Sequence, residues 1–429
     1  MSKEKITNAN SFPKDWPIKK LADIGSTYGG LTNKSKEDFA EGNSKFITYK
    51  NIYNNTFINT NELESVRIYK DEKQNKVKYG DVFFTGSSET PDEVGISSVL
   101  LEEVDDVYLN SFCFGFRFND LKKTIPEFYG YYFRGPVFRN EVYPLAQGST
   151  RFNLSKSEMV KLKVPVPPVK EQYKIAAILS SVDEAIEKTE AIIEQTEKVK
   201  KGLMQQLLTK GIGHTKFKKT EIGEIPEEWE LKKVEEVFYE VRDTSNNLEL
   251  YPLYSLTIEE GLVPKPDRYE RSFLLKNKEE NQYRLVYPQN ILFNPMNLRF
   301  GAIAISKERV PVSVSAYYNV LSTVNDNYLA EYYAYLFCSG LYISLYERIA
   351  TGSLIEKKRV HLSQFFKISV PVPPKDEQKK IVEIISSIEN KIQNEKQRLN
   401  QLQMTKKALM QVLLTGKVRV KVDNEVMSQ

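Results

Sequence analysis

The sequence predicts an α+β protein with two mixed α/β domains and two long helices that pair as an antiparallel coiled coil. Three observations lead to this fold class: a long segment that occurs twice, a regular spacing of apolar residues within both copies, and strand-like runs in the blocks before each copy. A chain of 429 residues is also long enough for several domains. We therefore expect an internal repeat with pseudo-two-fold character.

The repeat is the clearest feature of the chain. Residues 163–186 read KVPVPPVKEQYKIAAILSSVDEAI, and residues 369–392 read SVPVPPKDEQKKIVEIISSIENKI. The two copies align without a gap to the matching ends GLMQQLLT (202–209) and ALMQVLLT (408–415). A weaker echo lies upstream, where FPKDWPIKKLADI (12–24) resembles IPEEWELKKVEEV (225–237) and YGDVFFTG (79–86) resembles YPQNILFN (287–294). An internal duplication explains both matches.

Each copy carries start and stop signals for a helix. Proline disfavours helical geometry in the residue before it, so the VPVPP run is extended. Pro168 and Pro374 then suit a first helical turn, and Gly211 and Gly416 suit the position just after a helix end. We expect helices at 166–212 and 371–416.

Within these helices, apolar residues recur at alternating steps of three and four, which draws one narrow seam along each helix. The seam residues are Leu179, Val182, Ile186, Ile193, Leu203 and Leu207 in the first copy, and Ile385, Ile388, Ile392, Leu399, Leu402, Leu409 and Leu413 in the second. About 38 residues at 1.5 Å each give a rod of roughly 57 Å. The two rods are obvious partners for each other. Lys200, Lys406 and Glu395 interrupt the seams, and they mark either contacts to a partner protein or the pairing register.

The blocks before the helices are expected to be domains at 1–165 and 213–370, with a tail at 417–429. Runs such as DVFFTG and RLVYPQNILFN read as strands because β-rich apolar residues are bounded by Gly, Pro and Asn. EFYGYYFRGPVFRNEVY (127–143) and YLAEYYAYLFCSGLYISLYERI (328–349) read as helices. Their tyrosines are expected to pack a core instead of stacking on bases.

Composition limits the class of protein. Lysine and arginine total 61 against 57 acidic residues, and a net charge of +4 neither demands nor excludes nucleic acid. No run of about 18 apolar residues occurs, so no membrane span is expected, and the N-terminus lacks the apolar core of a signal peptide. We expect a cytoplasmic protein in which Cys113 and Cys338 are buried thiols.

The sequence contains few residues or motifs that are typical of catalysis. His214 and His361 are the two histidines, and neither has a Cys or His neighbour at metal-ligand spacing. The chain contains no phosphate-binding G-x-x-x-x-G-K-[ST] motif. Asp92, Asp120 and Lys122 fit a metal nuclease motif loosely, but a chain this rich in Asp and Lys matches such a short pattern by chance. We therefore expect no catalytic residue, no cofactor site and no metal site on this chain.

Binding is the better expectation, and several loops mix Gly with side chains that contact phosphates and base edges. The candidate DNA-contacting residues are Lys34, Lys36, Arg151, Asn153, Arg242, Asn297, Arg299, Lys357, Lys358 and Arg359. Each of these loops can equally be an ordinary solvated loop.

The doubled VPVPP…EQ motif, the shared LMQxLLT ending and the restart TEIGEIPEEWE (220–230) resemble the specificity subunit of type I restriction–modification systems. The resemblance implies that the two dissimilar blocks are target-recognition domains and that the repeated helices are the conserved spacer regions of this family. It also implies a bipartite double-stranded DNA site whose gap the helices set. The implied partners are two modification (methyltransferase) subunits and restriction subunits in a cytoplasmic complex. S-adenosylmethionine, ATP and Mg²⁺ would bind those partners.

Two other hypotheses remain beside this one. The chain could be a coiled-coil scaffold whose globular heads bind protein, or a stand-alone metal-dependent nuclease. Competition against random duplex DNA separates a sequence-specific binder from a scaffold. A nuclease requires magnesium-dependent cutting by the purified chain, abolished by Asp92→Ala.

Overall fold

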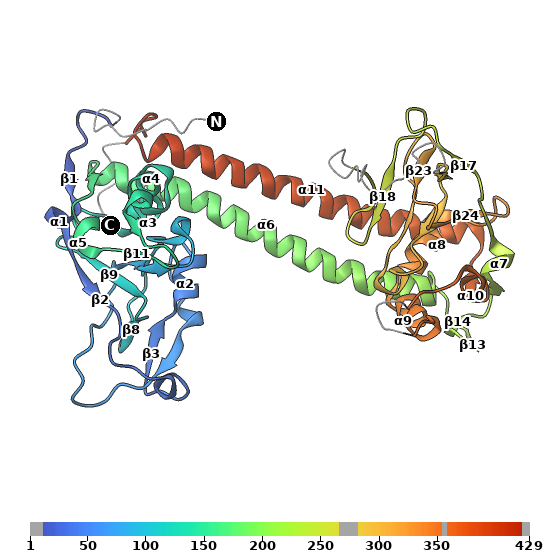
Figure 1. Cartoon of the computed structure of the whole chain (residues 1–429), viewed down its shortest axis with the longest axis horizontal. Coiled ribbons are helices and arrows are strands. Elements are labelled where there is room, and N and C mark those ends of the chain that lie inside the picture. The colour runs from blue at the N-terminus through green and yellow to red at the C-terminus, as the bar shows by residue number, and fades with distance from the viewer. Residues whose placement is uncertain (1–11, 266–281, 354–357, 423–429) are drawn as a thin grey trace. The chain divides into compact units, whose positions relative to one another are not determined.

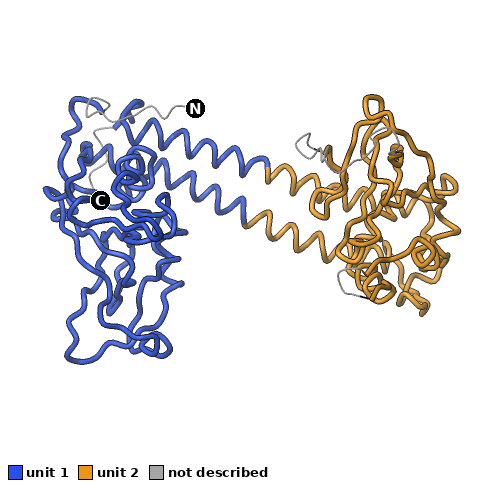
Figure 2. Tube along the Cα trace, in the orientation of Figure 1, with its two compact units in different colours: residues 1–190, 397–429 blue, residues 191–396 orange. Residues whose placement is uncertain are grey.

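A computed structural model describes residues 12–265, 282–353 and 358–422 of the chain (Figure 1). The chain divides into two compact units (Figure 2). Unit 1 comprises Met1–Glu190 and Gln397–Gln429, and unit 2 comprises Ala191–Lys396. Each unit contains one end of each long helix, whereas the domain boundaries expected from the sequence follow the helix ends. Those boundaries stay a prediction.

The two long helices are α6 (Val169–Lys210, 42 residues) and α11 (Lys375–Leu413, 39 residues). Both begin directly after the VPVPP run, and the carbonyls of Pro168 and Pro374 accept the first helical N–H groups. Both end before a glycine with positive φ, +65° at Gly211 and +67° at Gly416. The start and stop signals of the sequence are thus confirmed, because a left-handed residue after the last turn is the usual glycine cap.

The helices pack together within each unit, and none of the thirteen expected seam residues is exposed. Leu179, Ile193, Leu207, Ile385, Ile392 and Leu413 are buried, and the other seven are partly buried. In unit 1 the start of α6 lies beside the end of α11, and in unit 2 the end of α6 lies beside the start of α11. The expected antiparallel direction of the helix pair is therefore confirmed.

The lysines in the seam pair with acids on the opposite helix. In unit 1, Lys406 Nζ lies 2.6 Å from Asp183 Oδ1, and Tyr131 Oη donates to Asp183 Oδ2 at 2.8 Å. In unit 2, Lys200 Nζ lies 2.7 Å from Glu389 Oε1, and Tyr335 Oη donates to Glu389 Oε2 at 2.8 Å. The same lysine–carboxylate–tyrosine group thus occurs once in each unit. It fixes the register of the helix pair, because a slip of one residue would separate each lysine from its acid.

We expect Lys406→Ala to lower the free energy of unfolding by about 1–3 kcal/mol, because it leaves the Asp183 carboxylate in the seam without its cation. Asp183→Ala should cost a similar amount. The double variant should cost less than the two single variants added together. Urea denaturation of the full chain measures these values, and Lys407→Ala on the exposed face of α11 is the matched control. Strictly additive losses would show that the pair does not act as a unit.

Unit 1 is built around an antiparallel four-stranded sheet in the order β2-β9-β5-β7. Two three-stranded sheets, β4-β3-β8 and β10-β11-β6, and the β1-β12 pair complete it. The strands are β1 (Ile18–Lys20), β2 (Gly25–Gly29), β3 (Ser44–Ile47), β4 (Glu64–Val66), β5 (Val82–Thr85), β6 (Ser87–Ser88), β7 (Ser97–Val99), β8 (Val107–Leu109), β9 (Cys113–Phe118), β10 (Ala146–Gln147), β11 (Phe152–Leu154) and β12 (Lys163–Pro165).

Unit 2 repeats the four-stranded sheet with different residues, while its other strands are arranged differently. Its four-stranded sheet has the order β16-β24-β21-β22, joined by β17-β20-β23 and the pairs β18-β19, β13-β14 and β15-β25. The strands are β13 (Phe217–Thr220), β14 (Gly223–Pro226), β15 (Glu230–Lys233), β16 (Phe238–Glu240), β17 (Thr244–Ser245), β18 (Tyr254–Thr257), β19 (Gly261–Pro264), β20 (Tyr283–Val286), β21 (Ile291–Phe293), β22 (Ile303–Ile305), β23 (Val312–Val314), β24 (Asn319–Thr323) and β25 (Ser369–Val372). The echo segments YGDVFFTG and YPQNILFN contain β5 and β21, which occupy the same place in the two four-stranded sheets.

Short helices accompany the sheets in both units. In unit 1 they are α1 (Leu21–Ile24), α2 (Tyr49–Asn54), α3 (Pro126–Arg134), α4 (Pro136–Val142) and α5 (Lys156–Met159), with the 3-10 turns η2 (Lys36–Phe39), η3 (Thr60–Glu62), η4 (Pro91–Glu93) and η5 (Tyr143–Leu145). In unit 2 they are α7 (Val234–Val237), α8 (Ala330–Phe337), α9 (Gly340–Ile349) and α10 (Leu362–Phe366), with η8 (Leu298–Phe300).

The tyrosines of the two aromatic-rich helical stretches lie in the cores. Tyr129 and Tyr131 on α3 and Tyr332, Tyr333 and Tyr346 on α8 and α9 are almost fully buried. The start of one long helix and the end of the other close each core, through Leu179 and Leu413 in unit 1 and through Leu207 and Ile385 in unit 2. The expectation that these tyrosines serve packing is confirmed.

A buried glutamine ties each long helix to its unit. Gln172 Oε1 accepts the N–H of Ile125 at 2.8 Å, and its Nε2 donates to the carbonyls of Lys123 and Pro167. Gln378 repeats the pattern, with the N–H of Leu329 and the carbonyls of Asn327 and Pro373. Both glutamines are fully buried. The repeated EQ dipeptide is therefore a structural device that holds the first turn of each long helix.

Both cysteines are free thiols. Cys113 is buried as expected, but Cys338 is exposed. Cys338 directly follows the last residue of α8, at the edge of a groove, so its apolar sequence setting did not reveal its exposure. Among the helices of the described residues, none is long and apolar enough to cross a membrane.

Candidate functional site

Three loops of unit 1 meet at Gly86, directly after β5. The Gly86 N–H donates to the carbonyl of Phe112 at 2.9 Å, and the Gly86 carbonyl accepts the N–H of Leu154 at 2.9 Å. A Cβ at this position would lie 3.0 Å from the Phe112 carbonyl oxygen, so a larger residue would crowd the junction. The end of β5, the turn before β9 and strand β11 are thereby held together.

These loops line a small, open hollow of about 270 Å³, which we call the unit 1 hairpin site. Its lining residues are Tyr49, Ser87, Ser88, Glu89, Glu93, Phe112 and Arg151. Phe112 is 54% exposed, which is unusual for a phenylalanine beside a core strand. The Arg151 guanidinium carbon lies 5.3 Å from the centre of the Phe112 ring, within cation–π distance.

The Glu93 carboxylate is held in place inside this site. Ser88 Oγ donates to Glu93 Oε2 at 2.5 Å, and Tyr53 Oη donates to Glu93 Oε1 at 3.3 Å. The Glu93 carbonyl accepts from Thr85 Oγ1 at 2.7 Å, and the neighbouring Asp92 carbonyl accepts from Arg139 at 2.7 Å. The backbone and the side chain of Glu93 are thus both fixed before any ligand binds.

Unit 2 has a related junction at the end of β21. The Pro295 carbonyl accepts the N–H of Val360 at 3.0 Å, as the Gly86 carbonyl accepts that of Leu154 in unit 1. Thr351 and Arg359 exchange two backbone hydrogen bonds of 3.0 Å, so the segment that begins at Thr351 returns beside the loop after β21. The segment that carries Lys358 and Arg359 therefore meets the loop that carries Asn297 and Arg299.

The charge at this second junction is different. Arg299 Nη1 lies 3.2 Å from Glu347 Oε2, and Lys358 Nζ lies 3.5 Å from Glu347 Oε1. The Arg299 guanidinium also stacks over Phe300 at 4.3 Å, and its side chain is 8% exposed, whereas Phe300 is 53% exposed. Both cations lower the pKa of the Glu347 carboxyl, the hydrogen bond from Arg299 being the main cause. Much of the positive charge expected here is thus already neutralised.

The structure brings together some of the candidate DNA-contacting residues and separates others. Arg151 and Asn153 share the β10–β11 hairpin beside the unit 1 hairpin site, and both are exposed. Lys36, the first residue of η2, is exposed. The Lys34 side chain is 2% exposed because it pairs with Glu72 and donates to a backbone carbonyl, so its charge is not presented to solvent.

In unit 2, Arg242 is exposed but pairs with Glu240 at 2.9 Å. Asn297 and Arg359 are exposed, and Lys358 is partly exposed. Lys357 lies outside the described residues. The expected DNA contacts of the whole set stay a prediction, and Lys34 and Arg299 are weaker candidates than the sequence suggested because acids from elsewhere in the chain hold their charges.

Sequence reasoning missed Glu93 and Phe112. Both lie in segments without the Gly, Lys and Arg mixture used to select candidate loops. The cavity also joins three segments far apart in the chain, and a linear pattern does not reveal that meeting. The echo of YGDVFFTG in the second half was the one signal that pointed here, since Gly86 ends this segment and anchors the site.

The described residues contain no group of three or more His, Cys, Asp or Glu side chains that could hold a metal ion. Asp92 is exposed in η4, while Asp120 accepts the backbone N–H of Lys122 and pairs with Lys123 at 3.4 Å. His361 is the N-cap residue of α10, and His214 Nε2 lies 2.9 Å from Glu377 Oε1.

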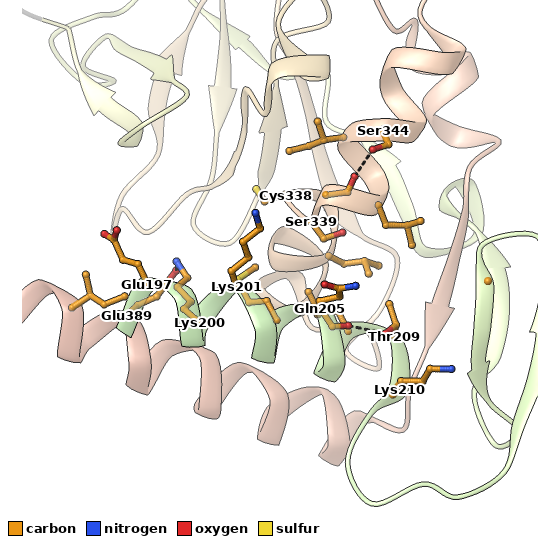
Figure 3. Close-up of a pocket in the computed structure, with 18 of the residues that line it drawn as sticks. Glu197, Lys200, Lys201, Gln205, Thr209, Lys210, Cys338, Ser339, Ser344 and Glu389 are labelled. Carbon is orange, nitrogen blue, oxygen red and sulfur yellow. Dashed lines mark hydrogen bonds and ion pairs between the residues drawn. The ribbon is translucent and has the colours of Figure 1, made fainter. Parts of the chain in front are cut away.

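A larger groove of about 1390 Å³ lies within unit 2, between the helix pair and the start of α9 (Figure 3). Figure 3 shows Lys201 reaching from α6 toward Cys338. Several other charges along the groove are paired, including Lys210 with Glu224 at 2.9 Å.

Comparison with known proteins identifies the repeated pattern. The family model described as the type I restriction modification DNA specificity domain matches the chain twice, at residues 13–198 and 226–404. These two matches together cover well over half of the chain.

Individual relatives align with most of this chain. The type I restriction enzyme MjaVIII specificity subunit of Methanocaldococcus jannaschii is 30% identical over 294 residues, which are 63% of this chain and 65% of that protein. The protein assigned as the MjaX specificity subunit in the same organism is 27% identical over 440 residues, with 97% of each chain covered. The crystal structure of the type I restriction–modification S subunit from M. genitalium has the same fold, with a TM-score of 0.55, 16% identity, and 95% of this chain and 97% of that chain covered.

Proposed function

Because this chain belongs to the type I restriction modification DNA specificity family, we propose that it selects the DNA sequence on which a type I restriction–modification complex acts. The observation that carries the proposal is that the family model matches the chain twice, and that the four-stranded sheets of the two units share one strand order but present different side chains at the strand end. Each unit reads one half of a bipartite site in double-stranded DNA. The chain is a non-catalytic specificity subunit that acts in the cytoplasm, where its DNA is.

Different side chains at the two junctions favour an asymmetric site. Unit 1 presents Arg151, Glu93 and an exposed Phe112, while unit 2 presents Phe300 beside an arginine already paired with Glu347. Base edges differ in their pattern of hydrogen-bond donors and acceptors, so two different sets of side chains select two different half-sites.

The long helices supply the spacing and a surface for partners. Each helix begins in one unit and ends in the other, so its length limits the gap between the two half-sites. Val199 and Ile384 in unit 2 and Met404 in unit 1 are exposed apolar residues on the outer faces of the helix pair. We assign these faces to the two methyltransferase subunits, with restriction subunits joining for cleavage. S-adenosylmethionine, ATP and Mg²⁺ bind those partners, and methylation of adenine amino groups is the expected outcome.

The test is methylome sequencing of a host that expresses this chain together with its methyltransferase partner. One gapped, asymmetric motif should be methylated, and methylation should vanish when this chain is omitted. Binding of the complex to that motif should exceed binding to random duplex by about 10³-fold or more at physiological salt, over a salt-sensitive non-specific background.

Two other results would point elsewhere. Equal binding to all duplexes, with no methylated motif, would favour the scaffold whose heads bind protein. Magnesium-dependent cutting by the purified chain, lost in Asp92→Ala, would favour the nuclease.

A further inference from the structure

Within the proposed DNA-selecting role, on which this inference rests, we propose that the unit 1 hairpin site reads one G·C base pair. Arg151 donates hydrogen bonds to the guanine, Glu93 accepts one from the amino group of the cytosine, and Phe112 holds the arginine in position.

The state of Arg151 is the first argument. Its side chain is exposed, and within the described parts of the chain its guanidinium makes no ion pair at 4 Å or less. Its partner is the Phe112 ring, which restricts the side chain but uses none of its N–H donors. An arginine fork with free donors matches the O6 and N7 acceptors of guanine in the major groove.

The second argument is the Glu93 carboxylate in the same cavity. An ionised carboxylate can accept about four hydrogen bonds, and Ser88 and Tyr53 supply two of them. The remaining acceptor positions suit the cytosine N4 amino group, which glutamate reads in the major groove. Because Ser88 and Tyr53 already hold the Glu93 carboxylate, little side-chain freedom is lost when the base binds.

The third argument is the hairpin that carries Arg151. A β-hairpin can enter the major groove of B-DNA, and β10 and β11 form the short outer hairpin of the sheet β10-β11-β6, with its tip at residues 148–151. Gly148 has φ +141°, and a Cβ there would lie 2.0 Å from the Arg151 carbonyl, so the tip is tight. Strand β11 pairs with β6 through Phe152 and Ser88, which keeps the hairpin beside Glu93.

Among the described residues of unit 2, no exposed arginine stacks on an aromatic ring, because Arg299 at the corresponding junction is 8% exposed and paired with Glu347. The G·C reading therefore belongs to one half-site, and variants in unit 1 should leave the other half-site unchanged.

The test uses the full complex of this chain with its methyltransferase partner, read by methylome sequencing and by competition binding with duplexes altered at single base pairs. Arg151→Ala should lower discrimination at one G·C position by about 5- to 150-fold. Glu93→Gln should shift the preference at that position toward A·T, because glutamine pairs with adenine N6 and N7. Arg67→Ala, an exposed arginine elsewhere in unit 1, and Arg359→Ala in unit 2 are the controls and should leave this position unchanged.

Three results would overturn the proposal: a half-site without G·C, an unchanged motif in both variants, or a uniform loss of affinity for every sequence in Arg151→Ala. The last would make Arg151 a phosphate contact. Glu93→Gln keeps the size and hydrogen-bonding capacity of the side chain, so it remains informative if Arg151→Ala folds poorly. Failure of the unaltered complex to methylate any gapped motif would instead contradict the proposed function itself.

Discussion

We expect a complex whose long helices are each shortened by one heptad to methylate a target with a shorter gap and the same two half-sites. The deleted residues are 187–193 of α6 and 396–402 of α11. Seven residues account for about 10.5 Å of helix, the length of roughly three base pairs. Each base pair removed also turns the second half-site by about a tenth of a turn around the duplex. We therefore expect the gap to shorten by about one to three base pairs, and methylation of the original target to be lost.

The two segments are chosen to preserve the helix pair. They lie opposite each other in the antiparallel register, and they leave intact the ion pairs of Asp183 with Lys406 and of Lys200 with Glu389. A control chain keeps its full length and carries alanine at exposed positions of the same segments, and it should methylate the original motif. Methylome sequencing reads both. A deletion variant that methylates the original gap would exclude the helices as the element that sets the spacing.

The repeated helices could be predicted to within four residues at each end because their signals are local. Proline before the first turn, glycine after the last and an apolar residue every third or fourth position are read along the chain itself. The expected range 166–212 compares with the observed α6, Val169–Lys210, and 371–416 with the observed α11, Lys375–Leu413. The pairing of the two helices followed from the same seam, since two adjacent apolar stripes bury each other.

The role of the charged seam residues could not be read locally. Lys200 meets Glu389, 189 positions away in the chain, and Lys406 meets Asp183. The sequence left open whether these lysines mark a partner surface or the helix register, and the ion pairs favour the register. The same reason explains Lys34 and Arg299, whose basic loops looked free to bind DNA because their acidic partners, Glu72 and Glu347, lie elsewhere in the sequence.

The candidate site was the least predictable part. Arg151 was chosen from its loop composition, but Glu93 and Phe112 reach the same cavity from two other segments through the hydrogen bonds of Gly86. Glycine suits this position because the Cβ of any other residue would crowd the Phe112 carbonyl. Sequence patterns predict helices and strands, whereas a binding site depends on how distant segments pack together. The internal repeat supported the prediction of the helices, but it gave no such support here because the two blocks differ in sequence.

Replacement of the buried glutamine at the start of α11 should destabilise unit 2 more than the loss of either seam ion pair. Gln378→Ala would leave the N–H of Leu329 and the carbonyls of Asn327 and Pro373 without their partner at a fully buried position. Each unsatisfied buried group costs about 1–3 kcal/mol, so we expect unit 2 to lose about 3–5 kcal/mol of its free energy of unfolding. Gln393→Ala, at an exposed position of the same helix, should cost less than about 0.5 kcal/mol.

The two tryptophans make this loss measurable in the intact chain, since Trp16 lies in unit 1 and Trp229 in unit 2, and both are buried. In a Trp16→Phe background, the fluorescence of Trp229 follows the unfolding of unit 2 in urea. The midpoint should fall strongly for Gln378→Ala and stay nearly constant for Gln393→Ala. Gln172→Ala, which removes the equivalent anchor of unit 1, should leave the Trp229 transition in place if the units unfold independently, and should shift it as well if the shared helices make them one cooperative system. A midpoint for Gln378→Ala no lower than that of Gln393→Ala would mean that water replaces the lost hydrogen bonds and that the repeated glutamine is not the anchor of the helix.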